Sequence, residues 1–354
     1  MSKLKVAFIG TGKVPEKAGP MGYAMAYRHA EAYKLLTDDV EMVACADIKP
    51  ENAQAFADKY GIAEVFTDYN EMLPAIRPDL VSICTWPHLH RQMIEDCAAA
   101  GVPAIHSEKP MAYSFGDAKA IVAAVEQSGT KLTFNHQRRY GLPFAMAKQF
   151  ADDGMIGKIQ KIEIGVGDLY DYGSHNFDMA NWFNGERNAE WVLCGLDYSK
   201  EKLIFGTHNE NHAIALWQYE NGVFGLAATG DAGASVGCHH RIIGSDGMIE
   251  IGRPGQPVLR VLQAGEPWVG FDCDGESCHG PNFIERCLAD VVDCFKTGRE
   301  CMMNARNALR ATEQIFACWE SVRRRGMVQL PLDIEDNPLR DMVERGDLKP
   351  AKAE

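Results

Sequence analysis

Two glycines and one aspartate near the start of the chain are residue types suited to binding a phosphate through the backbone and sugar hydroxyls through a carboxylate. Gly10 and Gly12 directly follow a β-rich apolar run at residues 5–9. In a turn from a strand into a helix, the first glycine permits the tight reversal, and the second lets the backbone approach a pyrophosphate at the helix N-terminus. Asp47 ends the next apolar run, where a carboxylate can accept hydrogen bonds from a ribose diol. Together the three residues predict a dinucleotide site.

The spacing within this group departs from the usual pattern. Asp47 lies 35 residues after Gly12, whereas the usual interval is about 20. We interpret residues 13–22 as an insertion between the turn and the helix, so that Ala26 is expected to be the small residue that packs the helix against the strand, with Gly22 as the alternative. Measured from Ala26, Asp47 is 21 residues further on. One insertion therefore explains both departures.

The carboxylate of Asp47 also bears on which dinucleotide binds. It would repel a 2′-phosphate, so NAD is favoured over NADP, although Lys49 nearby leaves NADP open. The alternative is that Asp47 caps the helix that begins at Pro50. If Pro50 is the first helical residue, the cap falls at Lys49 and Asp47 comes too early for that role.

A second group of residues, Asp171 and His175, has the types needed for proton transfer. Oxidation of a secondary alcohol needs a base for the hydroxyl proton, and an unperturbed imidazole titrates at about pH 6.5. Asp171 lies four residues before His175, so on one helical turn the two side chains would share a face. The carboxylate could then hold the imidazole tautomer. The alternative is a histidine that caps or packs at the N-terminus of a helix.

Two further clusters contain metal-ligating residue types, but their spacing argues against a metal. Cys273, Cys278 and His279 match no zinc pattern, so a loop with free thiols is favoured. His208 and His212 have metal spacing only on a helix, and they lie where a strand is predicted to begin. We therefore expect no metal site.

The elements that must position these residues alternate between strand and helix over residues 1–135. Such alternation implies parallel βαβ units in a doubly wound sheet, so a Rossmann domain of the α/β class is predicted there. The predicted strands are residues 5–9, 41–46, 80–85, 102–106 and 132–134, and the predicted helices are residues 23–36, 50–60, 89–100 and 114–128.

Residues 136–354 have a different pattern, which predicts a second, α+β domain with a large open, mainly antiparallel sheet. Asn221-Gly222 and Asp246-Gly247 are typical of hairpin turns because they supply a positive φ. The broad sheet face that such a meander exposes would be an interface, so we expect a homodimer or homotetramer. The predicted strands are residues 159–166, 212–219, 223–229, 239–244, 247–251 and 258–262, and the predicted helices are residues 143–152, 282–296 and 304–324.

Composition narrows the class of protein. The 354 residues include 36 Lys plus Arg against 49 Asp plus Glu, a net charge of −13, which argues against a nucleic-acid partner. No apolar run approaches the roughly 18 residues of a membrane span, and the N-terminal residues lack the features of a signal peptide. The 11 cysteines are scattered and odd in number, which is typical of reduced thiols. A cytoplasmic protein without membrane contact is expected.

Taken together, these segments resemble the glucose–fructose oxidoreductase and inositol dehydrogenase family (GFO/IDH/MocA). The resemblance rests on residues 79–90, the Glu-Lys-Pro motif at 108–110, residues 135–140 and residues 171–178, and it covers nearly the whole chain. The insertion after Gly12 and Trp86 before the loop proline depart from the family pattern. The resemblance implies cofactor contacts from Gly10, Gly12, Lys13, Asp47, Ile48, Thr85, Trp86, His88, His90, Glu108, Lys109 and Gln137.

The resemblance also implies the roles of residues around the substrate. Lys109 would hydrogen-bond the reacting hydroxyl after a cis peptide bond to Pro110, and either it or His175 would take the proton. Trp86 or Trp182 could provide an aromatic platform, and Asp168 is a weaker candidate contact. Substrate contacts are expected from Lys109, Arg139, Tyr170, Asp171, His175, Asn176 and His240.

The expected function is therefore hydride transfer between NAD and a secondary hydroxyl of a sugar, sugar derivative or inositol. One alternative is a glycoside-cleaving or epimerising enzyme that uses NAD without net redox change. Another is a nucleotide-binding regulator without catalysis. Such a regulator would be free to lose Lys109, Asp171 and His175, which this chain keeps.

Overall fold

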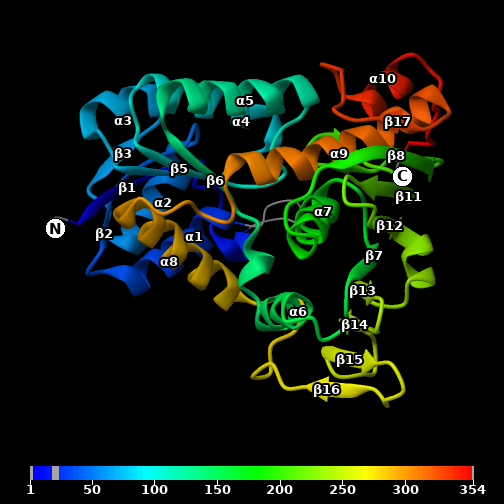
Figure 1. Cartoon of the computed structure of the whole chain (residues 1–354). Helices are drawn as coiled ribbons and strands as arrows, with labels where there is room; N and C mark the ends of the chain where they lie inside the picture. The colour runs from blue at the N-terminus through cyan, green and yellow to red at the C-terminus, as the bar shows by residue number, and fades with distance from the viewer. Residues whose placement is uncertain (1–2, 18–23, 353–354) are drawn as a thin grey trace. The chain divides into compact units, whose positions relative to one another are not determined.

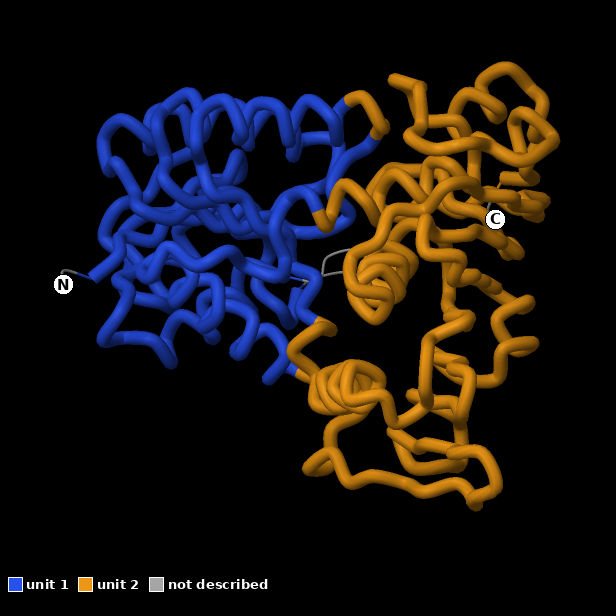
Figure 2. Tube along the Cα trace, viewed as in Figure 1, with its two compact units in different colours: residues 1–113, 117–137, 281–306 blue, residues 114–116, 138–280, 307–354 orange. Residues whose placement is uncertain are grey.

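The computed structural model describes residues 3–17 and 24–352 (Figure 1). The chain divides into two compact units: unit 1 comprises residues 1–113, 117–137 and 281–306, and unit 2 comprises the remainder (Figure 2). Compared with the expected single division after residue 135, residues 281–306 belong to unit 1 and residues 114–116 belong to unit 2. Helix α8 (Pro281–Thr297) returns to unit 1 because Ile284, Leu288 and Val292 pack into its core.

Unit 1 contains a six-stranded parallel sheet in the order β3-β2-β1-β4-β5-β6. Helices α3, α4 and α5 lie on one face, and α1 and α8 lie on the other (Figure 1). Every residue of β4 and β5 is buried, as expected of strands covered on both faces. The doubly wound prediction is confirmed. The strands are β1 (Leu4–Ile9), β2 (Val40–Ala46), β3 (Glu64–Phe66), β4 (Leu80–Ile83), β5 (Ala104–Ser107) and β6 (Lys131–Phe134).

The helices of unit 1 mostly match the predicted ranges. Two elements were not predicted: β3 has only three residues and is half-exposed, and α3 carries Pro74 inside the helix. Asp68 caps α3 by accepting a hydrogen bond from the N–H of Asn70 at 2.8 Å. Besides α8, the helices are α1 (Met25–Tyr33), α2 (Pro50–Tyr60), α3 (Tyr69–Ile76), α4 (Pro87–Ala99) and α5 (Phe115–Ser128), the last of which begins in unit 2.

Unit 2 contains a nine-stranded sheet in the order β16-β15-β14-β13-β7-β12-β11-β8-β17. The sheet is mixed, because β7 and β12 pair in parallel while the other neighbours are antiparallel. The predicted large, mainly antiparallel sheet is confirmed. Its one parallel pair joins strands between which α7, β8 and β11 intervene. The main strands are β7 (Ile159–Val166), β8 (Ala189–Asp197), β11 (His212–Tyr219), β12 (Phe224–Thr229), β13 (His240–Gly244), β14 (Gly247–Ile251), β15 (Leu259–Gln263), β16 (Val269–Phe271) and β17 (Val328–Gln329).

The two predicted hairpin turns of unit 2 use their glycines differently. Gly222 has φ +83° and donates its N–H to Tyr219 O at 2.8 Å, as predicted. Gly247 does not have a positive φ. A Cβ there would lie 2.3 Å from the carbonyl oxygen of Leu262, so close backbone approach requires that glycine.

The helices of unit 2 are α6 (Leu142–Asp152), α7 (Asp171–Phe183), α9 (Ala305–Arg324) and α10 (Pro338–Glu344). Almost every residue of α7 is buried, and the helix contacts β7. The short α10 was not predicted; Asn337 caps it. Among the described residues, no helix combines the length and apolarity that crossing a membrane requires.

Candidate active site

The turn after β1 has the shape that its glycines predict. Gly10 and Gly12 both have a positive φ, at +83° and +66°. A Cβ on Gly10 would lie 2.5 Å from Cγ2 of Thr85, so a larger residue does not fit without displacement. No atom of a described residue lies within 4 Å of the position that a Cβ on Gly12 would take. This open backbone fits the approach of a dinucleotide pyrophosphate.

The carboxylate of Asp47 is attached to this turn. Its Oδ2 accepts hydrogen bonds from the Gly12 N–H at 2.8 Å and from the Thr11 hydroxyl at 3.2 Å. Its Oδ1 accepts from the Lys49 N–H at 2.9 Å. Helix α2 begins at Pro50 with Lys49 at the N-cap position, so Asp47 is not the helix cap. The end of β2 and the glycine turn are thus held together by one buried carboxylate.

The predicted insertion is described only in part. Residues 18–23, which include the predicted start of the first helix, lie outside the described residues. Residues 15–17 form a 3-10 turn, and α1 begins at Met25. Ala26 is 1% exposed and belongs to the core of unit 1, as predicted for the residue that packs helix against strand.

Several predicted cofactor contacts have side chains available to a ligand. Ile48, just after β2, is 85% exposed, and Trp86, just before α4, is 44% exposed. Lys13 and His88 are also exposed, and Thr85 is half-buried. All five follow the carboxyl ends of β1, β2 or β4, where open α/β sheets bind ligands.

His90, by contrast, is fully buried within unit 1. Its ring nitrogens lie 3.2 Å from Met111 O and 3.0 Å from Thr85 O. Burial lowers the pKa of His90, so the neutral ring is favoured. His90 thus lies against the backbone of Thr85 and Met111, and its direct contact with the cofactor stays a prediction.

Glu108 is also directed into unit 1 and belongs to a buried hydrogen-bond network. Its Oε1 lies 2.9 Å from Nε2 of His29 and accepts from Nδ2 of Asn135 at 2.7 Å. Burial alone would raise the pKa of this carboxyl, but the hydrogen bonds and charge of His29, with Asn135 and Lys109, lower it to about 2. The network fixes Glu108 beside the backbone of Lys109, and its contact with the cofactor stays a prediction.

Sequence reasoning missed most members of this network. Ser82 Oγ lies 3.4 Å from Nδ1 of His29 and 3.1 Å from the Tyr33 hydroxyl, and the Cys287 thiol donates to Asn135 Oδ1 at 3.5 Å. These residues come from α1, β4 and α8 and the end of β6. No local sequence signal joins residues so far apart in the chain.

Lys109 follows β5 directly at the carboxyl edge of the sheet and is half-buried. Its peptide bond to Pro110 is cis, as the family resemblance implied. Its own N–H donates to Oε2 of Glu108 at 3.2 Å. Gln137, the last residue of its segment in unit 1, is half-buried as well.

The candidate proton-transfer pair lies at the start of α7 in unit 2. Asp171 is the first residue of the helix and His175 follows one turn later, so the predicted helical spacing is confirmed. Both side chains are 4% exposed. Oδ1 of Asp168 accepts hydrogen bonds from the N–H groups of Tyr170 and Tyr172 at 3.1 and 3.0 Å. Asp168 therefore fixes the N-terminus of α7, which explains its position without a substrate contact.

Arg139 was predicted to contact substrate, but its guanidinium is fully enclosed by protein partners. Nε and Nη2 donate to the two carboxylate oxygens of Asp178, both at 2.7 Å, and Nη1 donates to Glu186 at 2.5 Å. Burial alone would lower the pKa of Arg139, but the two carboxylates raise it. Its guanidinium also lies 5.7 Å from the Trp182 ring. These partners hold the guanidinium in place within unit 2, and the substrate contact of Arg139 stays a prediction.

Two other predicted substrate contacts lie in the core of unit 2. Tyr170 is 1% exposed, and its ring centroid is 5.7 Å from that of Trp319. His240 is fully buried between the rings of Phe144 and Phe183. Burial lowers the pKa of His240 to about 3, so the ring is neutral. Both side chains pack in this core, and their contacts with substrate stay predictions.

Arg138 and His239, which precede Arg139 and His240 in sequence, belong to a polar cluster with Asn176. Of these three residues, sequence reasoning selected Asn176 alone. Nη1 of Arg138 donates to Asn176 Oδ1 at 2.8 Å and lies 2.9 Å from Nε2 of His239. Asn176, a predicted substrate contact on α7, also donates to Tyr172 O at 2.6 Å. The guanidinium of Arg138 lies 5.6 Å from the Tyr172 ring.

Among the described residues, one group of three has metal-ligating atoms within reach of one another: Asp290, Cys294 and Cys301. Both thiols lie 3.6 Å from Oδ2 of Asp290, and Arg299 donates to Oδ1 at 2.5 Å. Burial raises the pKa of Cys294 to about 12. The earlier clusters, Cys273 with Cys278 and His279, and His208 with His212, do not form such a group in the described part of the chain.

Comparison with protein families gives two matches, one towards each end of the chain. A model of an oxidoreductase family with an NAD-binding Rossmann fold matches residues 4–136, and the C-terminal alpha/beta domain of the same family matches residues 159–330. The chain belongs to the GFO/IDH/MocA family. The resemblance predicted from sequence is thereby confirmed.

Individual members of this family show how far the likeness extends. The D-glucoside 3-dehydrogenase of Escherichia coli is 28% identical over 255 residues, which are 61% of this chain and 69% of that protein. The myo-inositol 2-dehydrogenase of Thermotoga maritima is 24% identical over 213 residues, 56% of this chain and 63% of that protein. A structure of levoglucosan dehydrogenase with NADH and levoglucosan has a TM-score of 0.77 at 19% identity, covering 94% of this chain and 100% of that one. The last comparison shows the shared fold.

Proposed function

We propose that this GFO/IDH/MocA protein is an NAD-dependent dehydrogenase of a secondary hydroxyl on a sugar, sugar derivative or inositol. The observation that carries the proposal is the buried pair Asp171 and His175 on the first turn of α7. This pair occurs in a chain that also has a Gly-x-Gly turn and an acidic residue at the end of β2. The names of the curated relatives, which include a glucoside and an inositol dehydrogenase, support the same substrate class.

Each part of this chain has a proposed task in the reaction. Bound NAD would accept the hydride, and the turn at Gly10 and Gly12 would hold its pyrophosphate. The ammonium of Lys109 would stabilise the alkoxide that develops as the hydride leaves. His175, oriented by Asp171, would take the hydroxyl proton. Alternatively, Lys109 would take it as the neutral amine and become the ammonium that stabilises the product oxygen. Separate pH profiles of Lys109→Met and His175→Asn decide between the two bases.

NAD rather than NADP is proposed because of the charge at Asp47. Its carboxylate already accepts the Gly12 N–H, so it occupies the end of β2 with a full negative charge beside the glycine turn. A 2′-phosphate there would meet like charge, whereas a ribose diol can donate to the same oxygens.

The test is an absorbance assay for reduced nicotinamide with NAD or NADP and a panel of inositols, aldoses, sugar acids and glycosides. We expect NADH with one substrate group and at least 100-fold less turnover in Lys109→Ala. Lys34→Ala, an exposed lysine of unit 1, is the matched control. Full turnover by Lys109→Ala would contradict the proposal. Bound NAD with no NADH across the panel would instead favour internal redox chemistry, which product analysis on glycosides would detect.

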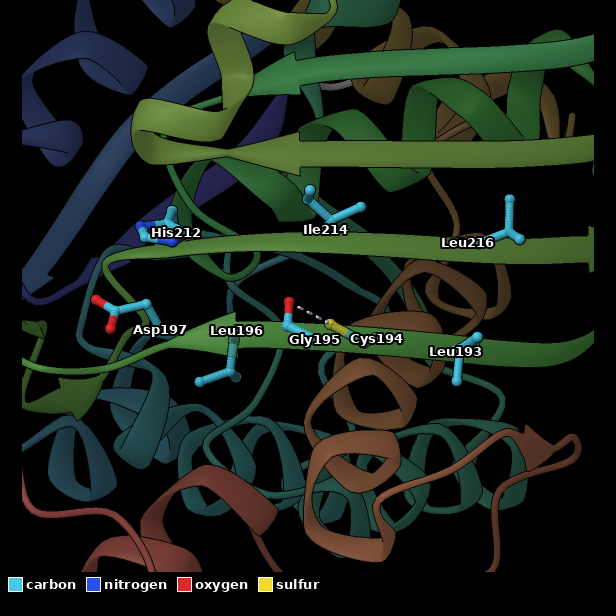
Figure 3. A pocket seen from close by; sticks show the side chains of 8 residues that line it. All are labelled: Leu193, Cys194, Gly195, Leu196, Asp197, His212, Ile214 and Leu216. Atoms are coloured by element: carbon cyan, nitrogen blue, oxygen red, sulfur yellow. Dashed lines mark hydrogen bonds between the residues drawn. The ribbon is translucent and has the colours of Figure 1, made fainter.

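We further propose that the protein forms a homodimer or homotetramer through one face of the unit 2 sheet. Residues alternate along β11, so that Ala213, Ala215 and Trp217 are buried while Ile214 is 53% exposed. On the neighbouring strand Leu193 is 44% exposed. Figure 3 shows the side chains of these two strands that line a shallow pocket on the sheet. An apolar exposed face of this kind is typical of an interface, and a second copy carries the same face.

A cytoplasmic location is also part of the proposal. All 11 cysteines are unpaired, and most of them are buried. Reduced thiols in a core are typical of reducing compartments. Fractionation of the native host, with the thiols titrated in the isolated protein, would test this point.

A further inference from the structure

Two adjacent buried arginines in unit 2 have opposite electrostatic environments. Arg139 uses its Nε and Nη2 edge to bind both carboxylate oxygens of Asp178, and Glu186 adds a second negative charge. Arg138 is 3% exposed, yet no carboxylate of a described residue lies within ion-pair distance of it. Arg139 is therefore paired with two carboxylates, whereas Arg138, the residue before it, is paired with none of the described ones.

The unpaired part of Arg138 is the edge that its neighbour uses for a carboxylate. Only Nη1 is engaged, with Asn176 Oδ1 at 2.8 Å and with His239 Nε2 at 2.9 Å. Nε and Nη2 form no hydrogen bond with the described residues, and neither belongs to the fully enclosed unpaired atoms. Both therefore keep some contact with solvent. A guanidinium binds a carboxylate best through two such parallel N–H groups.

The positive charge of Arg138 is buried without an ion-pair partner among the described residues, and this burial is energetically unfavourable. Burial lowers the pKa of Arg138 to about 10, and the opposing electrostatic contributions of Cys278, Tyr172, Asp171 and Asp168 do not offset it. An unpaired buried charge is costly and is retained where a ligand or a partner completes it. A metal ion would be repelled here, so the missing partner is an anion.

Two histidines hold the guanidinium in one orientation. Because an arginine N–H can only donate, Nε2 of His239 must accept, and the proton of that ring lies on Nδ1. That Nδ1 lies 2.7 Å from Nδ1 of His240, which accepts it. Burial lowers the pKa of both rings. Arg138 is therefore the one cation of this trio.

We propose that Arg138 binds a carboxylate of the substrate, so that the natural substrate is a carbohydrate acid rather than a neutral sugar or inositol. The carboxylate would pair with Nε and Nη2, and Asn176 and His239 would hold the guanidinium from behind. The inference rests on the proposed dehydrogenase function and narrows its substrate class. The hydrogen-bond partners of the guanidinium, Asn176 and His239, add no positive charge. A single guanidinium of this kind suits a carboxylate better than a doubly charged phosphate.

The first test uses the unaltered protein. NADH formation is measured with matched pairs, D-glucuronate with D-glucose and D-galacturonate with D-galactose, and with D-glucose 6-phosphate. We expect kcat/KM to be about 10- to 100-fold higher for the acid of the preferred pair, the range of one charge-assisted bidentate contact. Equal or better turnover of the neutral sugar, or a preference for the phosphate, would overturn the proposal.

The second test uses variants of Arg138. In Arg138→Met the ratio of kcat/KM for acid over neutral sugar should fall at least 10-fold, and Arg138→Lys should restore part of it. Arg187→Met, an exposed arginine of unit 2, is the matched control and should keep the ratio. A ratio unchanged in Arg138→Met would overturn the assignment. So would a weaker Kd for NAD in that variant with an unchanged ratio, since the anion would then belong to the cofactor.

The two proposals fail in different ways. If no sugar of either series gives NADH, the proposed function fails, and the anion site is then tested by calorimetry with D-galacturonate and D-glucuronate. Binding by the unaltered protein that is lost in Arg138→Met would support the site by itself. Absence of binding by the unaltered protein would overturn it.

Discussion

Replacing Glu108 with glutamine removes one negative charge from a buried network while keeping nearly the same shape. Glu108 is 5% exposed, and its carboxylate is hydrogen-bonded to His29 and Asn135. The fall of its pKa from the ordinary 4.5 to about 2 corresponds to about 3 kcal/mol of stability, at about 1.4 kcal/mol for each tenfold change. We expect Glu108→Gln to lower the free energy of unfolding by about that amount at pH 7.

The pH dependence follows from the direction of this shift. Because the pKa of Glu108 is lower in the folded protein than in the unfolded chain, its stabilisation is complete above about pH 4.5 and is lost as the pH falls towards 2. Urea unfolding of both proteins, followed by circular dichroism between pH 7 and pH 3, measures the difference directly. The difference should shrink steadily below pH 4.5.

A surface carboxylate provides the control for this experiment. Glu126 pairs with Arg306 at 2.8 Å, but both side chains are about half or more exposed, so Glu126→Gln should cost less than about 1 kcal/mol. A Glu108→Gln difference that stays constant from pH 7 to pH 3 would refute the reasoning, because it would reflect packing rather than charge.

Three further changes have expected outcomes. Gly10→Ala should weaken NAD binding at least 10-fold in calorimetry, since a Cβ at φ +83° would lie 2.5 Å from Thr85; unchanged binding would contradict the turn's role. Asp47→Ser should move the ratio of kcat/KM for NAD over NADP towards NADP by about 10- to 100-fold; an unchanged ratio would remove Asp47 from the ribose site. Ile214→Lys, on the exposed face of β11, should reduce the mass in light scattering to that of a monomer. An oligomer that survives this change must form through another surface.

Much of the fold follows from local pattern, and β7 and β11 match their predicted bounds to the residue. Strong alternation of apolar residues specifies such strands without knowledge of their neighbours. The parallel pairing of β7 with β12 could not be predicted in that way. It depends on which strands meet after the chain has passed through α7, β8 and β11.

The polar contacts that sequence reasoning missed have a common physical cause. Sequence reasoning selected Arg139 and His240, whereas Arg138 and His239 meet each other in the structure. Adjacent residues of an extended or tightly turned backbone point in different directions, and a pattern of residue types does not say which one faces the core. His29 was missed for a related reason, since its partner Glu108 lies 79 residues away. By contrast, Asp171 and His175 were placed correctly because the helical period alone relates them.

The return of α8 to unit 1 has a consequence for synthesis of the chain. Ile284, Leu288 and Val292 fill the same core as α1, so a ribosome must release residues beyond 297 before that core can close. Until then the nascent Rossmann sheet exposes an apolar patch, while the strands of unit 2 emerge between its two parts. A fragment ending at residue 137 would carry that patch permanently and should aggregate. The core of unit 1 can therefore be completed only after α8 has been synthesised.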